Sequence, residues 1–194
     1  GGAAISTVVR TSEPTADVEI DLSSSDTGEG TVSPSSLTFT AATWNSAQTV
    51  TVTGVDDDID DGNQAYSITT AAAQSTDSDY DGVDPNNVSV TNSDDDSAGI
   101  TVSPTSGLTT TEAGGTATFT VVLTSEPTAD VEIDLSSSDT GEGAVSPSSL
   151  TFTSANWNSA QTVTVTGVDD NIDDHHQTFS ITTAAAQSTD TSYD

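Results

Sequence analysis

Clustered carboxylates are the candidate functional groups of this chain. They form three groups, and two of these recur at a spacing of 113 residues. The first group follows Val55 and comprises Asp56, Asp57, Asp58, Asp60 and Asp61, and it recurs after Val168 as Asp169, Asp170, Asp173 and Asp174. The second pairs Asp26 with Glu29 and recurs as Asp139 with Glu142. The third is the triplet Asp94, Asp95 and Asp96.

These groups predict binding of Ca²⁺. The ion takes about 6–8 oxygen ligands, preferably carboxylates and backbone carbonyls on adaptable loops. The short side chain of Asp keeps several carboxylates close to one ion, and 24 of the 31 acidic residues are Asp. Zn²⁺ would favour Cys or His ligands, and the chain has no Cys. The alternative is that the acidic loops are simply solvated.

The acidic groups belong to an internal repeat. When residues 1–81 are aligned with residues 114–194, 67 of 81 positions are identical. A period of 113 fits one β-sandwich of roughly 100 residues per copy. We therefore expect two domains, residues 1–96 and 97–194, with the boundary at the triplet Asp94–Asp96. The second copy ends without a counterpart of residues 82–96, which indicates a window on a longer array or a strand supplied by a neighbouring chain.

The sequence predicts that β-strands flank these acidic loops. Apolar residues alternate with Thr or acidic residues along several short segments, and turn residues such as Glu126-Pro127 and Ser146-Pro147 separate them. In the second copy the alternating residues are Ala117, Phe119, Val121 and Leu123, then Val131, Ile133 and Leu135, then Leu150 and Phe152, Val163 and Val165, and Phe179 and Ile181. This pattern predicts an all-β chain of two tandem antiparallel Greek-key β-sandwiches of immunoglobulin-like type. The acidic run after Val55 then lies in a loop at one end of a sandwich.

Composition narrows the partners. The formal net charge is -30, with one basic residue, which excludes nucleic acid and anionic membranes as direct electrostatic partners. There is no Cys for a disulfide and no apolar run near the ~20 residues that span a bilayer, so no transmembrane segment is expected. Hydrophobic residues make up 31% of the chain, so each core is small and a bound metal could stabilise it.

Catalytic residues are scarce, and we expect that the chain is not an enzyme. No Cys or Lys is available as a nucleophile, and the only His residues, His175 and His176, occur in one copy. Two carboxylates could hydrolyse a glycoside, but neither repeat has an insertion that would form a pocket.

Two further features leave alternatives open. Trp44 and Trp157 follow a strand in each copy and could be core residues or an exposed platform for a sugar ring. The segment that carries Asp77, Asp79, Asp81 and Asp84 could bind a further cation or be a solvated loop.

Several of these segments resemble the Calx-beta family. Glu112–Phe119 is similar to its first strand, Ser138-Asp139-Thr140-Gly141 to an acidic loop, Val168–Ile172 to its hydrophobic-then-acidic loop, and Asp94–Asp96 to its closing acidic triplet. The resemblance implies a seven-stranded sandwich with several Ca²⁺ ions at one end, beside the next domain. In the first domain it implies the ligands Asp26, Asp56, Asp57, Asp60 or Asp61, and Asp94–Asp96. In the second it implies Glu112, Asp139, Asp169 and Asp170, with Asn171 in place of Asp58.

A second resemblance is to the Calx-beta-like or cadherin-like tandem repeats of large bacterial secreted adhesins and surface filaments. It implies an extracellular, cell-surface spacer, found in adhesion or biofilm formation, whose Asp-rich junction loops bind Ca²⁺ and stiffen the array. The expected partners are neighbouring repeats of the same or identical chains, with a possible cell-surface or glycan target. The alternatives are a carbohydrate- or surface-binding module, and a filament subunit that polymerises by strand donation.

Overall fold

In the described part of the chain the regular elements are all β-strands, as the alternating sequence pattern predicts. The computed structural model describes residues 2–172 and 175–194 and contains fifteen strands, β1 to β15, which pair antiparallel. The chain folds into two compact units. The first comprises residues 1–57 and 61–94, and the second comprises residues 58–60 and 95–194.

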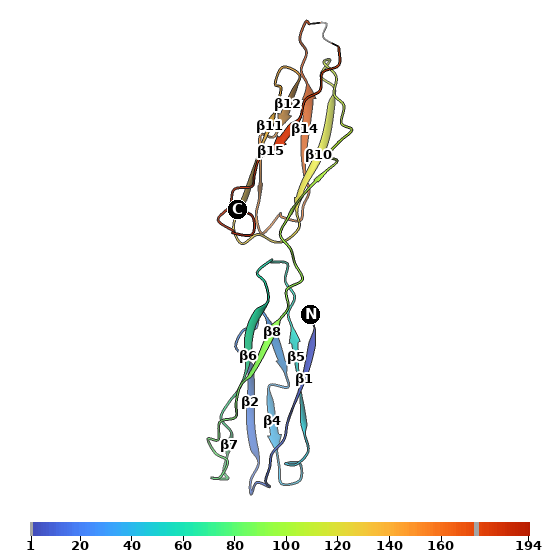
Figure 1. The fold of residues 1–194 in the computed structure, drawn as a ribbon. Helices are drawn as coiled ribbons and strands as arrows, with labels where there is room; N and C mark the ends of the chain where they lie inside the picture. The colour runs from blue at the N-terminus through green and yellow to red at the C-terminus, as the bar shows by residue number, and fades with distance from the viewer. Residues whose placement is uncertain (1, 173–174) are drawn as a thin grey trace. The chain divides into compact units, whose positions relative to one another are not determined.

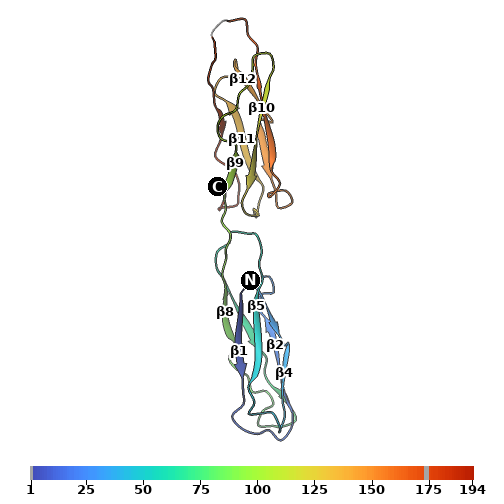
Figure 2. The same cartoon turned by 90° about the vertical axis from the view of Figure 1, so that its right-hand side faces the viewer.

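The first unit consists of two sheets. One sheet has the order β1 (Ala3–Val8), β5 (Gln48–Gly54) and β3 (Gly30–Ser33). The other has the order β4 (Ser36–Phe39), β2 (Val18–Ser24), β6 (Gln64–Thr70) and β8 (Val88–Asn92), and the two-residue β7 (Gln74–Ser75) also pairs with β2. Figure 1 and the turned view of Figure 2 both show β1 beside β5.

The second unit repeats this plan. One sheet has the order β12 (Gly143–Ser146), β14 (Gln161–Gly167), β10 (Thr116–Leu123) and β9 (Ile100–Ser103). The other has the order β13 (Ser149–Phe152), β11 (Val131–Ser137) and β15 (Ile181–Thr183). Matching strands have the same register, since Ser6 pairs with Val50 and Phe119 pairs with Val163.

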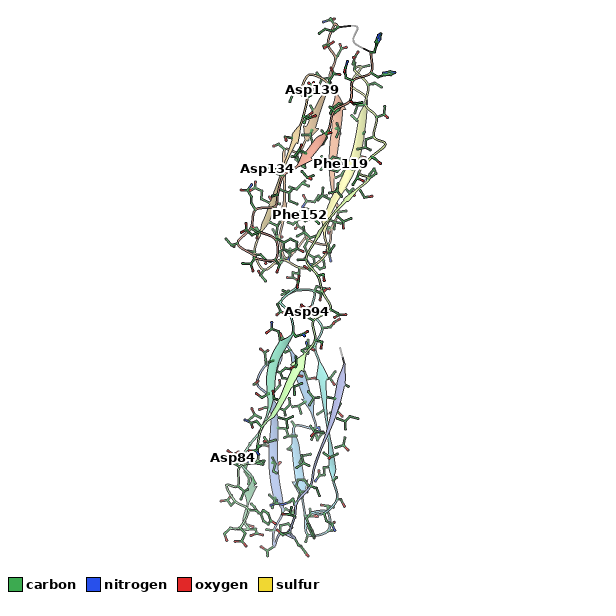
Figure 3. The ribbon with its side chains drawn as sticks, in the orientation of Figure 1. Asp84, Asp94, Phe119, Asp134, Asp139 and Phe152 are labelled. Carbon is green, nitrogen blue, oxygen red and sulfur yellow. The ribbon has the colours of Figure 1, made fainter. Side chains whose placement is uncertain are left out.

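The period-2 pattern places one face of each strand in the core. In β11, Val131, Ile133 and Leu135 are buried, whereas Glu132 and Asp134 point outward. Phe119 and Phe152 come from the two sheets and meet in one buried cluster, and both lie in the interior of the unit in Figure 3. The two sheets therefore form a sandwich, and the predicted fold class is confirmed.

Strand β1 and the segment that follows it depart from the repeat at inward positions. Ser6 stands where the second unit has Phe119, and Arg10 stands where it has Leu123, which is 3% exposed. Ile5, on the outward side, is 74% exposed. The buried residues of the first unit form two clusters, with Val50 in one and Val52 in the other, whereas those of the second unit form one. Position 6, opposite Val50, lacks the large side chain that Phe119 supplies to the single cluster of the second unit.

No helix among the described residues is long and apolar enough to cross a lipid bilayer.

Candidate functional site

The first acidic group lies in a loop that directly follows a central strand. Strand β5 ends at Gly54 and the acidic run begins at Asp56, and in the second unit β14 ends at Gly167 and the run begins at Asp169. The predicted ligands Asp173 and Asp174 lie outside the described residues. The expectation that an inter-strand loop carries this acidic run is therefore met for Asp56–Asp61 and, in the second unit, for Asp169 and Asp170.

Several of these carboxylates accept hydrogen bonds from backbone N–H groups. In the first unit, Asp94 Oδ2 accepts from the N–H of Gly62 at 2.7 Å. In the second unit, Asp60 Oδ2 accepts from the N–H of Ala98 at 2.8 Å, and Asp170 Oδ1 accepts from that of Ile172 at 2.7 Å. Charge-assisted bonds of this kind are stronger than bonds between neutral groups. They hold each loop in place through its acidic residues.

Asp26 and Asp139 have the same surroundings in the two units. Each carboxylate accepts the N–H of the glycine two residues later, Gly28 or Gly141, at 2.9 Å. This local bond is the Asx turn that Asp favours between strands. Both side chains are exposed, and the label in Figure 3 shows Asp139 at the end of its strand.

The other predicted ligands are mostly on the surface. Asp96 is half-buried, and the exposed ones are Asp56, Asp57, Asp58, Asp61, Asp95, Glu112 and Asp169. Within residues 2–172 and 175–194, no group of three or more His, Cys, Asp or Glu side chains is close enough together to hold a metal ion. The oxygen donors are of the type that Ca²⁺ prefers, but in the described part of the chain they are not assembled into a site. The ligand set thus stays a prediction.

Two buried carboxylates have a different role. Asp77 and Asp190 are each 8% exposed and occupy matching positions. Asp77 accepts hydrogen bonds from the N–H of Thr15 at 2.7 Å and of Asp79 at 3.1 Å. Asp190 accepts from the N–H of Thr128 at 2.8 Å and of Ser192 at 3.0 Å. Each carboxylate joins two loops that are far apart in the sequence.

The hydrogen bonds hold the pKa of both carboxyls below its usual value. At Asp77 the N–H of Thr15 has the largest effect on the pKa, followed by that of Asp79, while burial opposes them and the charge of Arg10 adds a smaller effect. At Asp190 burial raises the pKa, but the N–H groups of Ser192 and Thr128 together outweigh it. Both groups are therefore ionised and bonded at neutral pH.

Asp77 is neither part of a solvated loop nor grouped with other carboxylates around a cation. Asp79, Asp81 and Asp84, which belong to the same acidic segment, are exposed. The distinguishing signal was in the repeat: Ser75-Thr76-Asp77 recurs as Ser188-Thr189-Asp190, whereas Asp79 becomes Ser192. In both copies the Ser Oγ accepts the N–H of the buried Asp at 3.0 Å.

Arg10, the single Lys or Arg residue of the chain, lies near Asp77 in the first unit. The Arg10 guanidinium stacks over Tyr80, with its central carbon 3.4 Å from the ring centroid, and lies 5.9 Å from the centroid of Phe39. Its buried Nη1 has no hydrogen-bond partner among the described residues. A cation thus occupies the place of a core leucine.

The two tryptophans are half-buried. Trp157 packs against the core of the second unit, as the core interpretation predicts. The carbonyls of Trp44 and Trp157 accept the N–H groups of Arg10 and Leu123. Their main-chain role is therefore the same in the two units.

Comparisons with known proteins found similarity to solved structures at low sequence identity. No family model and no curated protein matches it. Among solved structures, "Crystal structure of CBD12 from CALX1.2" is similar with 16% identity and a TM-score of 0.44, and "Crystal structure of calcium binding domain CBD12 of CALX1.1" with 19% identity and a TM-score of 0.43. Each match covers 96% of this chain and 75% of the other. At these values the likeness establishes neither the family nor the function of this chain.

Proposed function

We propose that the chain is a non-enzymatic structural repeat of an extracellular adhesin or surface filament, and that its acidic loops bind Ca²⁺. One observation carries the proposal: two nearly identical units present carboxylates at the same loop positions. Asp26 and Asp56 of the first unit recur as Asp139 and Asp169, in a chain with 31 acidic residues and one basic residue. Repeated carboxylate oxygens on loops are a donor set for a hard cation.

The charge supplies the driving force. A net charge of -30 destabilises the compact state through self-repulsion. A divalent cation relieves this repulsion most strongly where carboxylates are adjacent, as in Asp94–Asp96. If Ca²⁺ binds only the folded chain, it stabilises that state by about 2.7 kcal/mol when the free ion is a hundredfold above its Kd.

Binding would require the loops to gather their carboxylates. Asp60 and Asp94 each use one carboxylate oxygen to accept a backbone N–H. An ionised carboxylate has about four lone-pair sites, so each group can keep that bond and still coordinate an ion. Ca²⁺ would then restrict the loops around Asp56–Asp61 and Asp94–Asp96, and through them the motion of successive repeats. This is how a spacer in a long array would be stiffened.

Melting with and without Ca²⁺ tests the proposal. We expect EDTA to lower the Tm, and the triple substitution Asp94→Ala, Asp95→Ala and Asp96→Ala to reduce the rise in Tm that Ca²⁺ restores. A matched control removes the same charge from exposed strand positions through Glu19→Ala, Glu132→Ala and Asp134→Ala, and should keep that rise. If the two triple variants respond alike, the acidic triplet is not a Ca²⁺ ligand.

The surface location has its own test. Antibody raised against the chain should label intact cells of the source organism. Labelling only after lysis would contradict the extracellular assignment and leave the Ca²⁺ measurement unaffected.

A further inference from the structure

One sheet of each unit is built from strands that carry no charge. In the second unit this sheet consists of β12, β14, β10 and β9, and in the first unit of β1, β5 and β3. None of these strands contains an acidic or basic residue. The chain has 31 acidic residues, so the uncharged sheet contrasts with the acidic loops at the strand ends.

Hydroxyl groups cover the outer side of this sheet. Side chains alternate along a strand, so the residues between the buried Phe119, Val121, Val163 and Val165 point outward. We call this surface the hydroxyl face. In the second unit it comprises Thr116, Thr118, Thr120, Thr162, Thr164 and Thr166, with Ser103 and Ser146 on the flanking strands.

The hydroxyl groups are aligned from strand to strand. Thr118 pairs with Thr164, and Thr164 pairs on its other side with Ser146. Residues that lie directly opposite each other point to the same side of a sheet. A row of three hydroxyl groups therefore crosses the sheet, with about 4.8 Å between neighbouring strands.

The first unit has the same surface. Ala3, Ile5 and Thr31 stand where the second unit has Thr, Thr and Ala, so none of these exchanges introduces a charge. The other members of the face in this unit are Thr7, Ser33, Thr49, Thr51 and Thr53.

Strand propensity alone does not explain an uncharged surface. Thr is a good strand former, but the other sheet of each unit has carboxylates on its outer side. These are Glu19 and Asp21 on β2, and Glu132 and Asp134 on β11. The fold therefore tolerates acidic residues at outward strand positions, yet the hydroxyl face has none.

We propose that the hydroxyl face associates with the hydroxyl face of a second copy of this chain. A hydroxyl group both donates and accepts hydrogen bonds, whereas a carboxylate only accepts them. A surface of hydroxyl groups is therefore complementary to itself, as a symmetric pair requires. Such a pair brings no strand carboxylates face to face, and the Thr methyl groups and Ile5, which is 74% exposed, add apolar area.

The size of the face indicates that both units take part. From the strand lengths, the face covers roughly 380 Å² in the second unit and roughly 280 Å² in the first. A stable interface buries about 600–1,000 Å² per partner. One face alone is too small, whereas the two together reach the lower end of this range. Contact through one unit would also raise the effective concentration for contact through the other.

Sedimentation velocity of the full chain in EDTA tests this association. About 1 M NaCl shortens the Debye length to about 3 Å, which screens the repulsion between acidic chains. We expect the sedimentation coefficient to rise with protein concentration toward that of a dimer, and to rise less at low salt. Thr49→Asp together with Thr162→Asp places a carboxylate at an exposed, matching position of each face. This pair of substitutions should lower the association constant about tenfold or more, because like charges would meet across the interface.

Ser23→Asp together with Ser136→Asp is the matched control, since it adds the same charge at exposed positions of the other sheet. This variant should associate like the parent chain. Thermal melting checks that each variant folds, and Thr31→Asp with Ser146→Asp on the edge strands β3 and β12 replaces the first pair if it does not.

Three results would overturn the proposal. A chain that stays monomeric at every concentration would leave the hydroxyl face to another partner. An equal loss of association in the two charged pairs would show general repulsion rather than contact through this face. Association that appears only when Ca²⁺ replaces EDTA would show that the ion bridges carboxylates of different chains.

Discussion

Phe119 on β10 and Ser6 at the matching position of β1 allow a test in which each unit serves as a reference for the other. Phe119 on β10 is 5% exposed, and the first unit has Ser6 at the matching position in the same register. Phe119→Ser therefore introduces a residue that this fold already carries. Removing a buried Phe side chain costs about 3–5 kcal/mol, against a typical domain stability of about 5–15 kcal/mol.

Urea unfolding followed by tryptophan fluorescence measures the effect in the second unit alone. Each unit contains one tryptophan, so a Trp44→Phe background leaves Trp157, which packs against the core of the second unit. With an m-value of about 2 kcal/mol per molar urea, the midpoint should fall by roughly 1.5–2.5 M.

Thr118→Ile is the control for this substitution. It introduces the residue that the first unit has at position 5, on the exposed side of the same strand. A surface change of this kind is expected to stay within about 0.5 kcal/mol. If Phe119→Ser shifts the midpoint no more than Thr118→Ile does, the assignment of the inward and outward faces is wrong.

Three further predictions concern the groups beside the core. Arg10→Leu should stabilise the first unit by about 1–2 kcal/mol, measured by urea unfolding with the fluorescence of Trp44. A buried donor without a hydrogen-bond partner costs about 1–3 kcal/mol, and the stacking on Tyr80 that the variant loses is worth less. A less stable variant would contradict this prediction. Asp190→Asn should lower the free energy of unfolding at neutral pH, because the pKa of Asp190 in the folded chain lies below the unfolded value of about 3.9. The difference in stability from wild type should persist above that pH and shrink as the pH falls through the folded pKa. A difference that does not change with pH would exclude the bonded carboxylate as its cause. Gly30→Ala should cost about 1–3 kcal/mol, because an added Cβ would collide with Tyr66, which is held under β8. Gly143→Ala should cost less, because Phe179 lines a cavity of about 1050 Å³ in the second unit and can move; equal costs in thermal melts would argue against this difference.

Local pattern was enough to predict the strands and most of the core. The alternation of Val131, Ile133 and Leu135 with Glu132 and Asp134 is typical of a half-buried strand, and the structure has that strand. The repeat also predicted that the acidic runs lie in loops after β5 and β14. These features depend on neighbours in sequence, which the pattern contains.

Features that depend on distant partners could not be predicted in this way. Residues 177–183 carry a strand sequence, but the structure has a strand only at Ile181–Thr183. Asp94 and Asp60 look like free ligands in the sequence, yet they accept N–H groups 32 and 38 residues away. Asp77 is buried by contacts with a loop 62 residues away. In each case the residue type determines the chemistry of the group, and the tertiary structure selects its partner.

Calorimetric titration of the full chain with Ca²⁺, after treatment with EDTA, measures directly whether the acidic loops bind this ion. We expect saturable binding, with heat that is largely lost in the triple variant Asp94→Ala, Asp95→Ala and Asp96→Ala and retained in the matched strand triple variant. Absence of saturable binding at millimolar Ca²⁺, together with an unchanged Tm, would contradict the assignment of the acidic loops to Ca²⁺.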